Sequence, residues 1–170
     1  MALNTLADYE RDYPYPRKVT LCYLINEEKG MVLLAMKKRG FGTGKWNGVG
    51  GKLDKGESVE QALVRETKEE IGVDLISFKK IGVIKFYFSE AQDRSFDQEV
   101  NVYTADSWKG SPSESDEMSP RWFGINEIPF DQMWSDDRFW LSDALNGKYV
   151  EASFMFDGSG NVKQSSIRLR

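Results

Sequence analysis

The sequence contains no histidine and only one cysteine, Cys22, among its 170 residues. Without histidine, no imidazole can act as a general base, a metal ligand or a member of a catalytic triad. Acid–base chemistry would therefore depend on carboxylates, lysine, tyrosine or metal-bound water. A single cysteine excludes an intramolecular disulfide. Because Cys22 lies in an apolar run, we expect a small buried side chain in a reducing compartment rather than a reactive thiol.

Long apolar runs and a surplus of positive charge are also missing. No segment approaches the roughly 18 apolar residues of a membrane span, and residues 1–16 lack the apolar region of a signal peptide. Lys and Arg number 23 against 27 Asp and Glu, a net charge of −4. Coating a nucleic acid requires clustered surplus cations. We therefore expect a cytoplasmic monomer that binds neither nucleic acid nor membrane.

The composition is sufficient for one folded domain, since 40% of the residues are hydrophobic and 13% are aromatic. Pro14 and Pro16 discourage regular structure near the N-terminus, so residues 1–16 are interpreted as an irregular leader and 17–170 as a single domain. Strand patterns outnumber helical ones, which predicts an α/β (α+β) fold with a mixed β-sheet and helices on its faces. The expected strands are 18–26, 31–38, 75–88, 99–104, 121–124, 150–156 and 162–169.

One helix is strongly predicted over residues 59–71. Ser58 and Gln61 have the spacing of a capping box, and Gly72 supplies a left-handed stop. At about 100° per residue, Glu66 and Glu70 fall on the same side as the apolar residues that must face the protein. The apolar side consists of Val59, Ala62, Leu63 and Thr67.

The acidic residues of this helix have two interpretations. A glutamate-rich helix end is most often a solvated face. Glu66, Glu69 and Glu70, however, stand at i, i+3 and i+4, where side chains one turn apart converge. Three carboxylates in a half-buried site favour a bound divalent cation with oxygen ligands. The preceding segment, 39–51, holds six glycines and is interpreted as a loop that cradles a ligand rather than merely a flexible one.

These residues resemble a family signature. Gly51, Glu57 and the run REXXEEXG beginning at Arg65 are spaced as in the Nudix box, and only Thr67 departs, where the pattern has an aliphatic residue. The resemblance implies the Nudix fold, with a mixed β-sheet core sandwiched between helices. It also implies hydrolysis of a nucleoside diphosphate linked to another group, with Mg²⁺ as the cofactor and Mn²⁺ as a substitute.

Three further segments, 36–52, 115–118 and 128–137, resemble the mutator-type (MutT) Nudix hydrolases of the mammalian branch, which act on oxidised purine nucleoside triphosphates. Ser135 departs, where that subfamily usually has proline. The resemblance assigns metal binding to Glu66, Glu69, Glu70, Glu117 and the carbonyl of Gly50, with Glu57 and Arg65 bracing the loop against the helix. It assigns substrate contacts to Thr20, Lys37, Phe41, Asn47, Val49, Gly50, Gly51, Lys52, Phe86, Trp134, Ser135, Asp136 and Asp137.

Each assignment has a plainer alternative: the aromatic residues could be ordinary core, and residues 37–39 a solvated basic edge. Asp136 and Asp137 are most simply a pair of charges at a helix start. In a dry pocket, however, repulsion and burial would keep one of them protonated. The pair would then offer a donor and an acceptor, which suits an oxidised purine with its added carbonyl and relocated N–H. Unpaired buried groups could disfavour the wrong base by about 10⁴-fold.

The resulting hypothesis is attack of water on the triphosphate, at the β phosphorus by resemblance, to release a nucleoside monophosphate and pyrophosphate. Such an enzyme would sanitise the nucleotide pool by removing 8-oxo-dGTP and 2-oxo-dATP type nucleotides. Glu69 and Glu117 are the alternatives for the general base. Two other functions stay open: a Nudix hydrolase of another modified dNTP, an NTP or a dinucleoside polyphosphate, or a nucleotide sensor without turnover.

Overall fold

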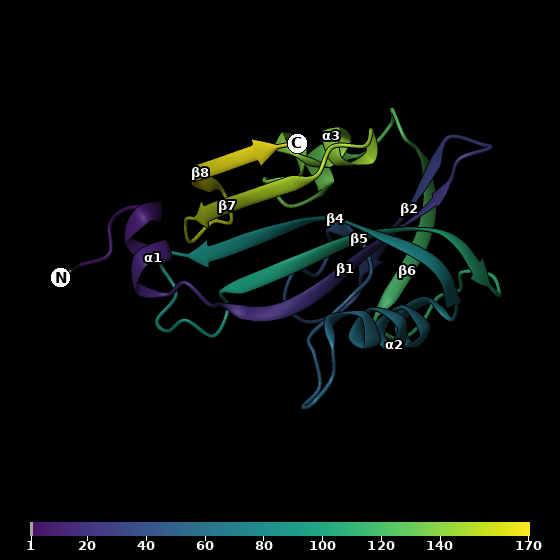
Figure 1. Ribbon diagram of the computed structural model, residues 1–170, viewed down its shortest axis with the longest axis horizontal. Coiled ribbons are helices and arrows are strands. Elements are labelled where there is room, and N and C mark those ends of the chain that lie inside the picture. Colours follow the sequence, from purple (N-terminus) through teal and green to yellow (C-terminus); the bar gives the residue numbers. More distant parts are fainter. Residues whose placement is uncertain (1) are drawn as a thin grey trace.

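The structure, a computed structural model, describes residues 2–170. Its centre is a mixed sheet in the order β3-β2-β1-β5-β4-β7-β8, with β6 paired to β2 beside this path (Figure 1). The strands are β1 (Arg17–Asn26), β2 (Met31–Lys37), β3 (Trp46–Asn47), β4 (Asp74–Phe88), β5 (Gln98–Lys109), β6 (Met118–Gly124), β7 (Val150–Phe156) and β8 (Val162–Leu169). The pairs β1/β5 and β4/β7 are parallel and the remaining pairs antiparallel, which confirms the predicted mixed sheet.

The helix α2 (Val59–Ile71) has the predicted bounds. Ser58 and Gln61 form both bonds of the capping box, and Gly72 ends the helix at a φ of 76°. The departure from the Nudix box, Thr67, is fully buried, as expected for the apolar side of the helix. Its hydroxyl donates to the carbonyl of Leu63 at 2.7 Å. That bond satisfies the buried hydroxyl, so threonine can stand in an aliphatic position.

Successive side chains of the central strands point to opposite faces of the sheet and build two separate clusters. One face carries Leu34, Ile84 and Phe154. The opposite face carries Cys22 and Leu33, which pack against Leu63 and Ile71 of α2. Among the described residues, only short helical segments lie over the first face: η1 (Phe130–Gln132), η2 (Asp137–Phe139) and α3 (Leu141–Leu145).

The leader prediction was wrong in part, because Leu6–Asp12 form a helix, α1. Thr5 and Asp8 make a capping box at its start. Leu6 and Tyr9 are buried against Tyr87 and Met155, at the end of the molecule away from α2 (Figure 1). A seven-residue helix is marginal in isolation, so this tertiary contact stabilises it.

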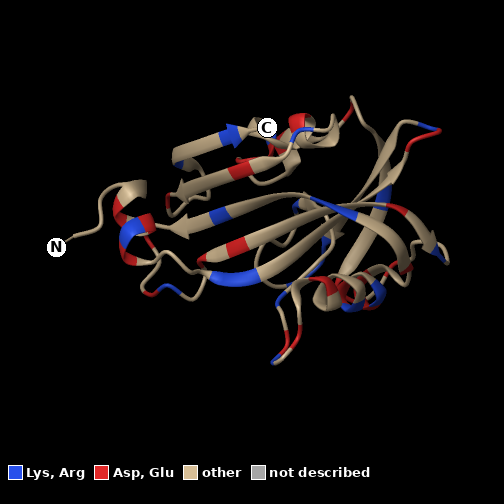
Figure 2. Ribbon diagram, in the orientation of Figure 1, with Lys and Arg blue, Asp and Glu red and all other residues tan. Residues whose placement is uncertain are grey.

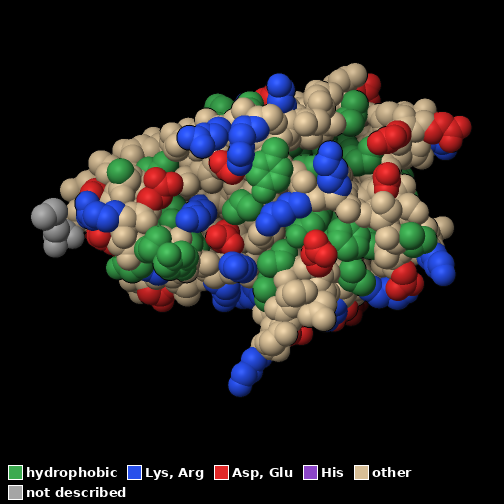
Figure 3. All heavy atoms as spheres, in the orientation of Figure 1, with side chains coloured by type: hydrophobic (Ala, Val, Ile, Leu, Met, Phe, Trp, Pro, Cys, Tyr) green, Lys and Arg blue, Asp and Glu red, His purple; other side chains and the backbone are tan. Residues whose placement is uncertain are grey.

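Charge is distributed unevenly along the chain. Charged residues alternate closely along α2, whereas the strands are mostly uncharged (Figure 2). On the surface seen in Figure 3, side chains of both signs are mixed with hydrophobic ones. None of the helices in residues 2–170 combines the length and apolar character that a membrane span requires.

Candidate active site

A cavity of about 330 Å³ opens between the first face of the sheet, the glycine-rich loop and residues 134–140. Most of the residues that the resemblance assigned to the substrate line this cavity. They are Thr20, Lys37, Phe41, Asn47, Gly50, Gly51, Lys52, Phe86, Trp134, Asp136 and Asp137. Segments far apart in the sequence therefore meet at one concave site, which is where a ligand is expected to bind.

Two assigned residues do not line the cavity. Val49 is buried in the cluster beneath α2, and its backbone pairs with that of Cys22. Ser135 Oγ donates to the carbonyl of Gly160 at 3.0 Å and accepts from the N–H of Val162 at 3.1 Å. Both residues lie behind the lining of the cavity and stabilise the segments that form it. A shared sequence motif does not show which of its residues line a cavity and which pack behind the lining, because adjacent residues of an extended segment point in opposite directions.

Other lining residues were not foreseen, among them Trp140, Phe88, Phe96 and Gln98. Phe88 follows Phe86 at the strand period of two, so that pattern could have identified it. No local signal marks Trp140, which follows η2 directly and lines the cavity.

The aspartate pair lies at the dry end of the cavity. Asp136 is 2% exposed and Asp137 is 3% exposed. Trp140 Nε1 donates to Asp136 Oδ2 at 2.8 Å, whereas Asp137 Oδ2 has no hydrogen-bond partner among the described residues. Burial raises the pKa of Asp136 to about 6. Burial, and then the charge of Asp136, raise the pKa of Asp137 well above its ordinary value. The pair can thus retain a proton near neutral pH.

The two inward glutamates of α2 lie behind the glycine-rich loop. Glu70 is 5% exposed and accepts the N–H of Gly50 at 3.1 Å. Burial, opposed by that bond and reinforced by the charges of Glu66 and Glu117, raises the pKa of Glu70 to about 8. Burial also raises the pKa of Glu66. A Cβ on Gly51 would meet the Glu66 carboxyl carbon at 2.5 Å, so only glycine allows this approach.

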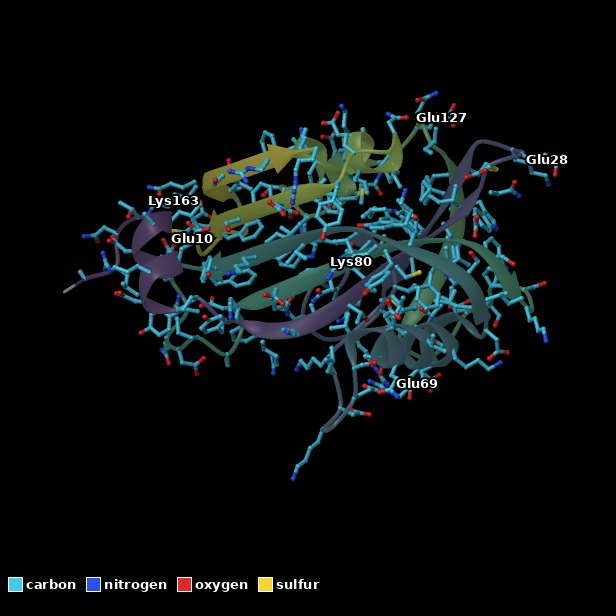
Figure 4. The ribbon with its side chains drawn as sticks, in the orientation of Figure 1. Glu10, Glu28, Glu69, Lys80, Glu127 and Lys163 are labelled. Carbon is cyan, nitrogen blue, oxygen red and sulfur yellow. The ribbon has the colours of Figure 1, made fainter. Side chains whose placement is uncertain are left out.

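The other acidic residues, Glu69 and Glu117, are more exposed than this pair. Glu69 points outward from α2 (Figure 4) and its Oε2 lies 3.2 Å from Arg65 Nη1. Glu117 is half exposed and pairs with Arg39 at 3.2 Å. Across residues 2–170, no three His, Cys, Asp or Glu side chains gather closely enough to hold a metal as they stand. Glu66 Oε1 and Glu69 Oε2 both lie close to Arg65 Nη1, at 3.0 and 3.2 Å, whereas Glu70 accepts the N–H of Gly50, so the expected convergence of all three carboxylates is not seen.

Arg65 joins the loop to the helix, as expected. Its Nε lies 2.7 Å from Glu57 Oε2 and its Nη2 lies 2.8 Å from Glu57 Oε1. Arg65 Nη2 also donates to the carbonyl of Lys52 at 3.0 Å. The hydrogen bonds from Arg65, followed by that from the N–H of Asp54, lower the pKa of Glu57 to about 2.

The donor chemistry of this region fits a divalent metal ion. Glu66, Glu70 and Glu117 supply carboxylate oxygens, the ligand type that hard divalent cations prefer. The charges of Glu66 and Glu117 both act to raise the pKa of Glu70. A bound cation would favour the ionised form of all three.

Residues 14–143 match the NUDIX domain. The chain belongs to the Nudix family. Two relatives are the oxidized purine nucleoside triphosphate hydrolases of Danio rerio and Mus musculus. The first is 49% identical over 140 residues, which cover 82% of this chain and 88% of the relative. The second is 38% identical over 152 residues, which cover 89% of this chain and 94% of the relative. As a member of this family, the protein is a Nudix hydrolase of the type that depends on divalent metal ions.

Solved structures agree with the fold. The crystal structure of a mutator MutT protein from Bacillus halodurans superimposes with a TM-score of 0.76 at 21% identity. The match covers 89% of this chain and 97% of that one. This likeness confirms the predicted Nudix fold.

Proposed function

We propose that this protein hydrolyses oxidised purine nucleoside triphosphates, of the 8-oxo-dGTP and 2-oxo-dATP type, to the monophosphate and pyrophosphate. The observation that carries the proposal is the buried Asp136 and Asp137 pair at the end of an aromatic cavity whose other end adjoins the Nudix helix. The two relatives named as oxidized purine nucleoside triphosphate hydrolases support it.

The aspartate end of the cavity would hold the base. With one proton between them, Asp136 and Asp137 offer a donor and an acceptor to a purine edge. Asn47 lines the same cavity and its Oδ1 accepts the hydroxyl of Tyr23 at 3.3 Å, which fixes the amide. Trp134 and Phe86 supply apolar walls. A base without the matching N–H and carbonyl would leave buried groups unpaired, which is costly.

The other end would hold the triphosphate. Lys37 and Lys52 line the cavity and offer cations for phosphate oxygens. Gly50 and Gly51 form the wall between the cavity and the carboxylates of Glu66 and Glu70. A nucleotide whose base contacts the aspartates would therefore extend its phosphates toward α2.

We propose that Mg²⁺, with Mn²⁺ as a substitute, is held by Glu66, Glu69, Glu70, Glu117 and the carbonyl of Gly50. A bound divalent cation would neutralise phosphate charge and make a water more acidic. Glu69 and Glu117 are the candidates to take the proton of the attacking water, since both are solvent-accessible beside the inward glutamates. The ion pair between Glu57 and Arg65 would fix the position of the loop relative to α2.

The direct test compares kcat/KM for 8-oxo-dGTP and dGTP in the presence of Mg²⁺. We expect a strong preference for the oxidised nucleotide, and a ratio near unity would exclude the damaged-base function. Glu70→Gln should abolish turnover, and excess chelator should do the same to the parent enzyme. Tight binding of nucleotides without release of pyrophosphate would instead indicate a sensor. Cytoplasmic location, the monomeric state and the lack of a nucleic-acid partner stay predictions.

A further inference from the structure

The N-terminal segment packs on the sheet opposite the cavity. On β4, Phe86 and Phe88 line the cavity, whereas Lys85 and Tyr87 point to the other face. Lys85 Nζ donates to the carbonyl of Pro14 at 2.8 Å, and the Tyr87 hydroxyl donates to that of Tyr13 at 3.0 Å. The helix α1 is also tied to β7, where Ser153 Oγ donates to Glu10 Oε1 at 2.5 Å.

The loop 89–97 passes from this rear face to the cavity. Near its end, Phe96 lines the cavity with its ring centroid 5.2 Å from that of Phe41. Phe41 in turn lies 5.2 Å from Trp134 by the same measure. Phe96 is 46% exposed, so it has few other contacts to hold it there. Its position depends on how the loop itself is anchored.

Arg94 is the anchor within the loop. Its Nη2 donates to the carbonyls of Phe88 at 2.9 Å and Ala91 at 3.2 Å. Its Nη1 lies 3.3 Å from Oδ2 of the buried Asp97, whose other oxygen accepts the N–H of Phe88 at 3.0 Å. These contacts close the loop on itself and fix the backbone on either side of Ser95 and Phe96.

Residues 9–17 form a clamp that holds Arg94 from outside the loop. The Arg94 guanidinium lies 4.9 Å from the ring centre of Tyr9 and 5.8 Å from that of Tyr13. The Tyr9 hydroxyl donates to the carbonyl of Ser89 at 3.3 Å, and Arg17 Nη2 donates to that of Ser95 at 2.7 Å. The loop is thus held at its start, middle and end by residues 9–17.

We propose that Arg94 and the N-terminal segment are positioning elements that hold Phe96 as a further aromatic wall of the cavity, where it contacts the base of the bound nucleotide. Arg94 does not touch substrate and acts through Phe96. The inference rests on the proposed function for the identity of the ligand, but the clamp itself is a property of the chain. The N-terminal segment would therefore affect how tightly substrate binds rather than the rate of the hydrolysis step.

A double-mutant cycle tests the coupling. Phe96→Ala should raise KM for 8-oxo-dGTP roughly tenfold with kcat nearly unchanged, because contact with an aromatic ring stabilises a bound base. Arg94→Ala should raise KM in the same direction. In the Phe96→Ala background, Arg94→Ala should add little further, since the two changes remove one interaction. Multiplicative effects on KM, or an equal fall in kcat, would overturn the proposal.

Tyr9→Ala tests the clamp, with Arg11→Ala as its matched control. Arg11 lies on the same helix but pairs only with Asp8 and Asp12 among the described residues, at the exposed side. We expect Tyr9→Ala, but not Arg11→Ala, to speed amide hydrogen exchange in residues 89–97. Exchange does not depend on substrate, so it tests the clamp even if the enzyme hydrolyses no oxidised nucleotide, a result that would overturn only the proposed function. Unchanged exchange in the Tyr9→Ala protein would overturn the clamp.

Discussion

Trp140 Nε1 donates a hydrogen bond of 2.8 Å to Asp136 Oδ2, four residues earlier in the chain, and both side chains are almost fully buried. This bond, together with a weaker contribution from the backbone N–H of Asp136, favours the ionised form of Asp136 and acts against burial, which raises the pKa to about 6. The protonation of the aspartate pair thus depends on an aromatic residue that lines the same cavity.

The first prediction concerns this bond. Trp140→Phe removes the donor, so the pKa of Asp136 should rise further and its titration should move to higher pH. Carboxyl ¹³C NMR over a pH series measures the shift directly. Trp122→Phe is the control, because Trp122 stacks on Trp108 in a separate cluster. An unchanged Asp136 titration in the Trp140→Phe protein would show that the hydrogen bond has no influence on the pair.

The second prediction concerns substrate recognition. Asp136→Asn cannot ionise, so the pair can no longer share one proton in the arrangement that an oxidised purine requires. We expect kcat/KM for 8-oxo-dGTP to fall by about 10²-fold or more. Binding of Mn²⁺, measured by electron paramagnetic resonance, should hardly change. Equal losses of nucleotide turnover and metal affinity would mean that Asp136 is only structural.

The third prediction is a dependence of stability on pH. The pKa of Asp136 is 3.8 ordinarily and about 6 in the folded protein, so the folded state binds more protons between these values. The free energy of unfolding should therefore fall as pH rises from about 4 through 6. In Asp136→Asn this loss is absent, and the variant should gain roughly 1–3 kcal/mol on the parent by pH 7.5.

Urea unfolding at pH 4.5, 6.0 and 7.5 measures the difference between the two proteins. The advantage of the Asp136→Asn variant should be small at the lowest pH and grow toward the highest. A constant difference across the series would contradict the raised pKa.

The fourth prediction separates two adjacent glycines. A Cβ on Gly51 meets the Glu66 carboxyl at 2.5 Å, which is the free end of a flexible side chain. A Cβ on Gly50 meets the backbone carbonyl oxygen of Thr20 at 1.9 Å, which cannot move without shifting β1. Gly51→Ala should therefore weaken Mn²⁺ binding with little loss of Tm, whereas Gly50→Ala should lower Tm and activity together. Calorimetric scans and metal titrations of both variants decide this, and similar Tm values would refute the distinction.

The fifth prediction concerns the brace between loop and helix. Arg65→Gln leaves the carboxylates of Glu57 and Glu66 without their shared cation, so Tm should fall by roughly 3–8 °C at pH 7. Lys68→Gln on the same helix breaks only an exposed pair with Asp74, and should change Tm by about 1 °C or less. A thermal scan of both variants makes the comparison. Equal shifts would show that the Glu57 brace contributes no more than a surface pair.

Where the controlling interactions are local, sequence reasoning succeeded. The bounds of α2 follow from a capping box and a terminal glycine, both within one turn of the helix ends. The hairpin of β7 and β8 follows from turn residues between two strand patterns. Most of the residues that the family resemblance assigned to the substrate do line the cavity, because a resemblance contains information about spatial neighbours that spacing alone lacks.

Where distant contacts decide, sequence reasoning failed. The capping residues of α1 are present in the sequence, but the two prolines that follow it predict irregular structure. The helix is stabilised by packing against Tyr87 and Met155, which are distant in the sequence. Val49 and Ser135 were assigned to the ligand, but Val49 packs in the cluster beneath α2 and Ser135 donates to the carbonyl of Gly160. In a connecting segment, the direction of each side chain depends on backbone turns that no short pattern specifies.

By itself, the sequence determined the chemistry available to this protein: carboxylates at helical spacing, a glycine-rich loop, and no imidazole at all. Only the tertiary structure decided which carboxylates are buried. Residues distant in the sequence shield Glu70 and Asp136 from solvent, whereas Glu69 stays exposed. Burial is a property of neighbours from every side, and it is burial that raises the pKa of Asp136 and Glu70.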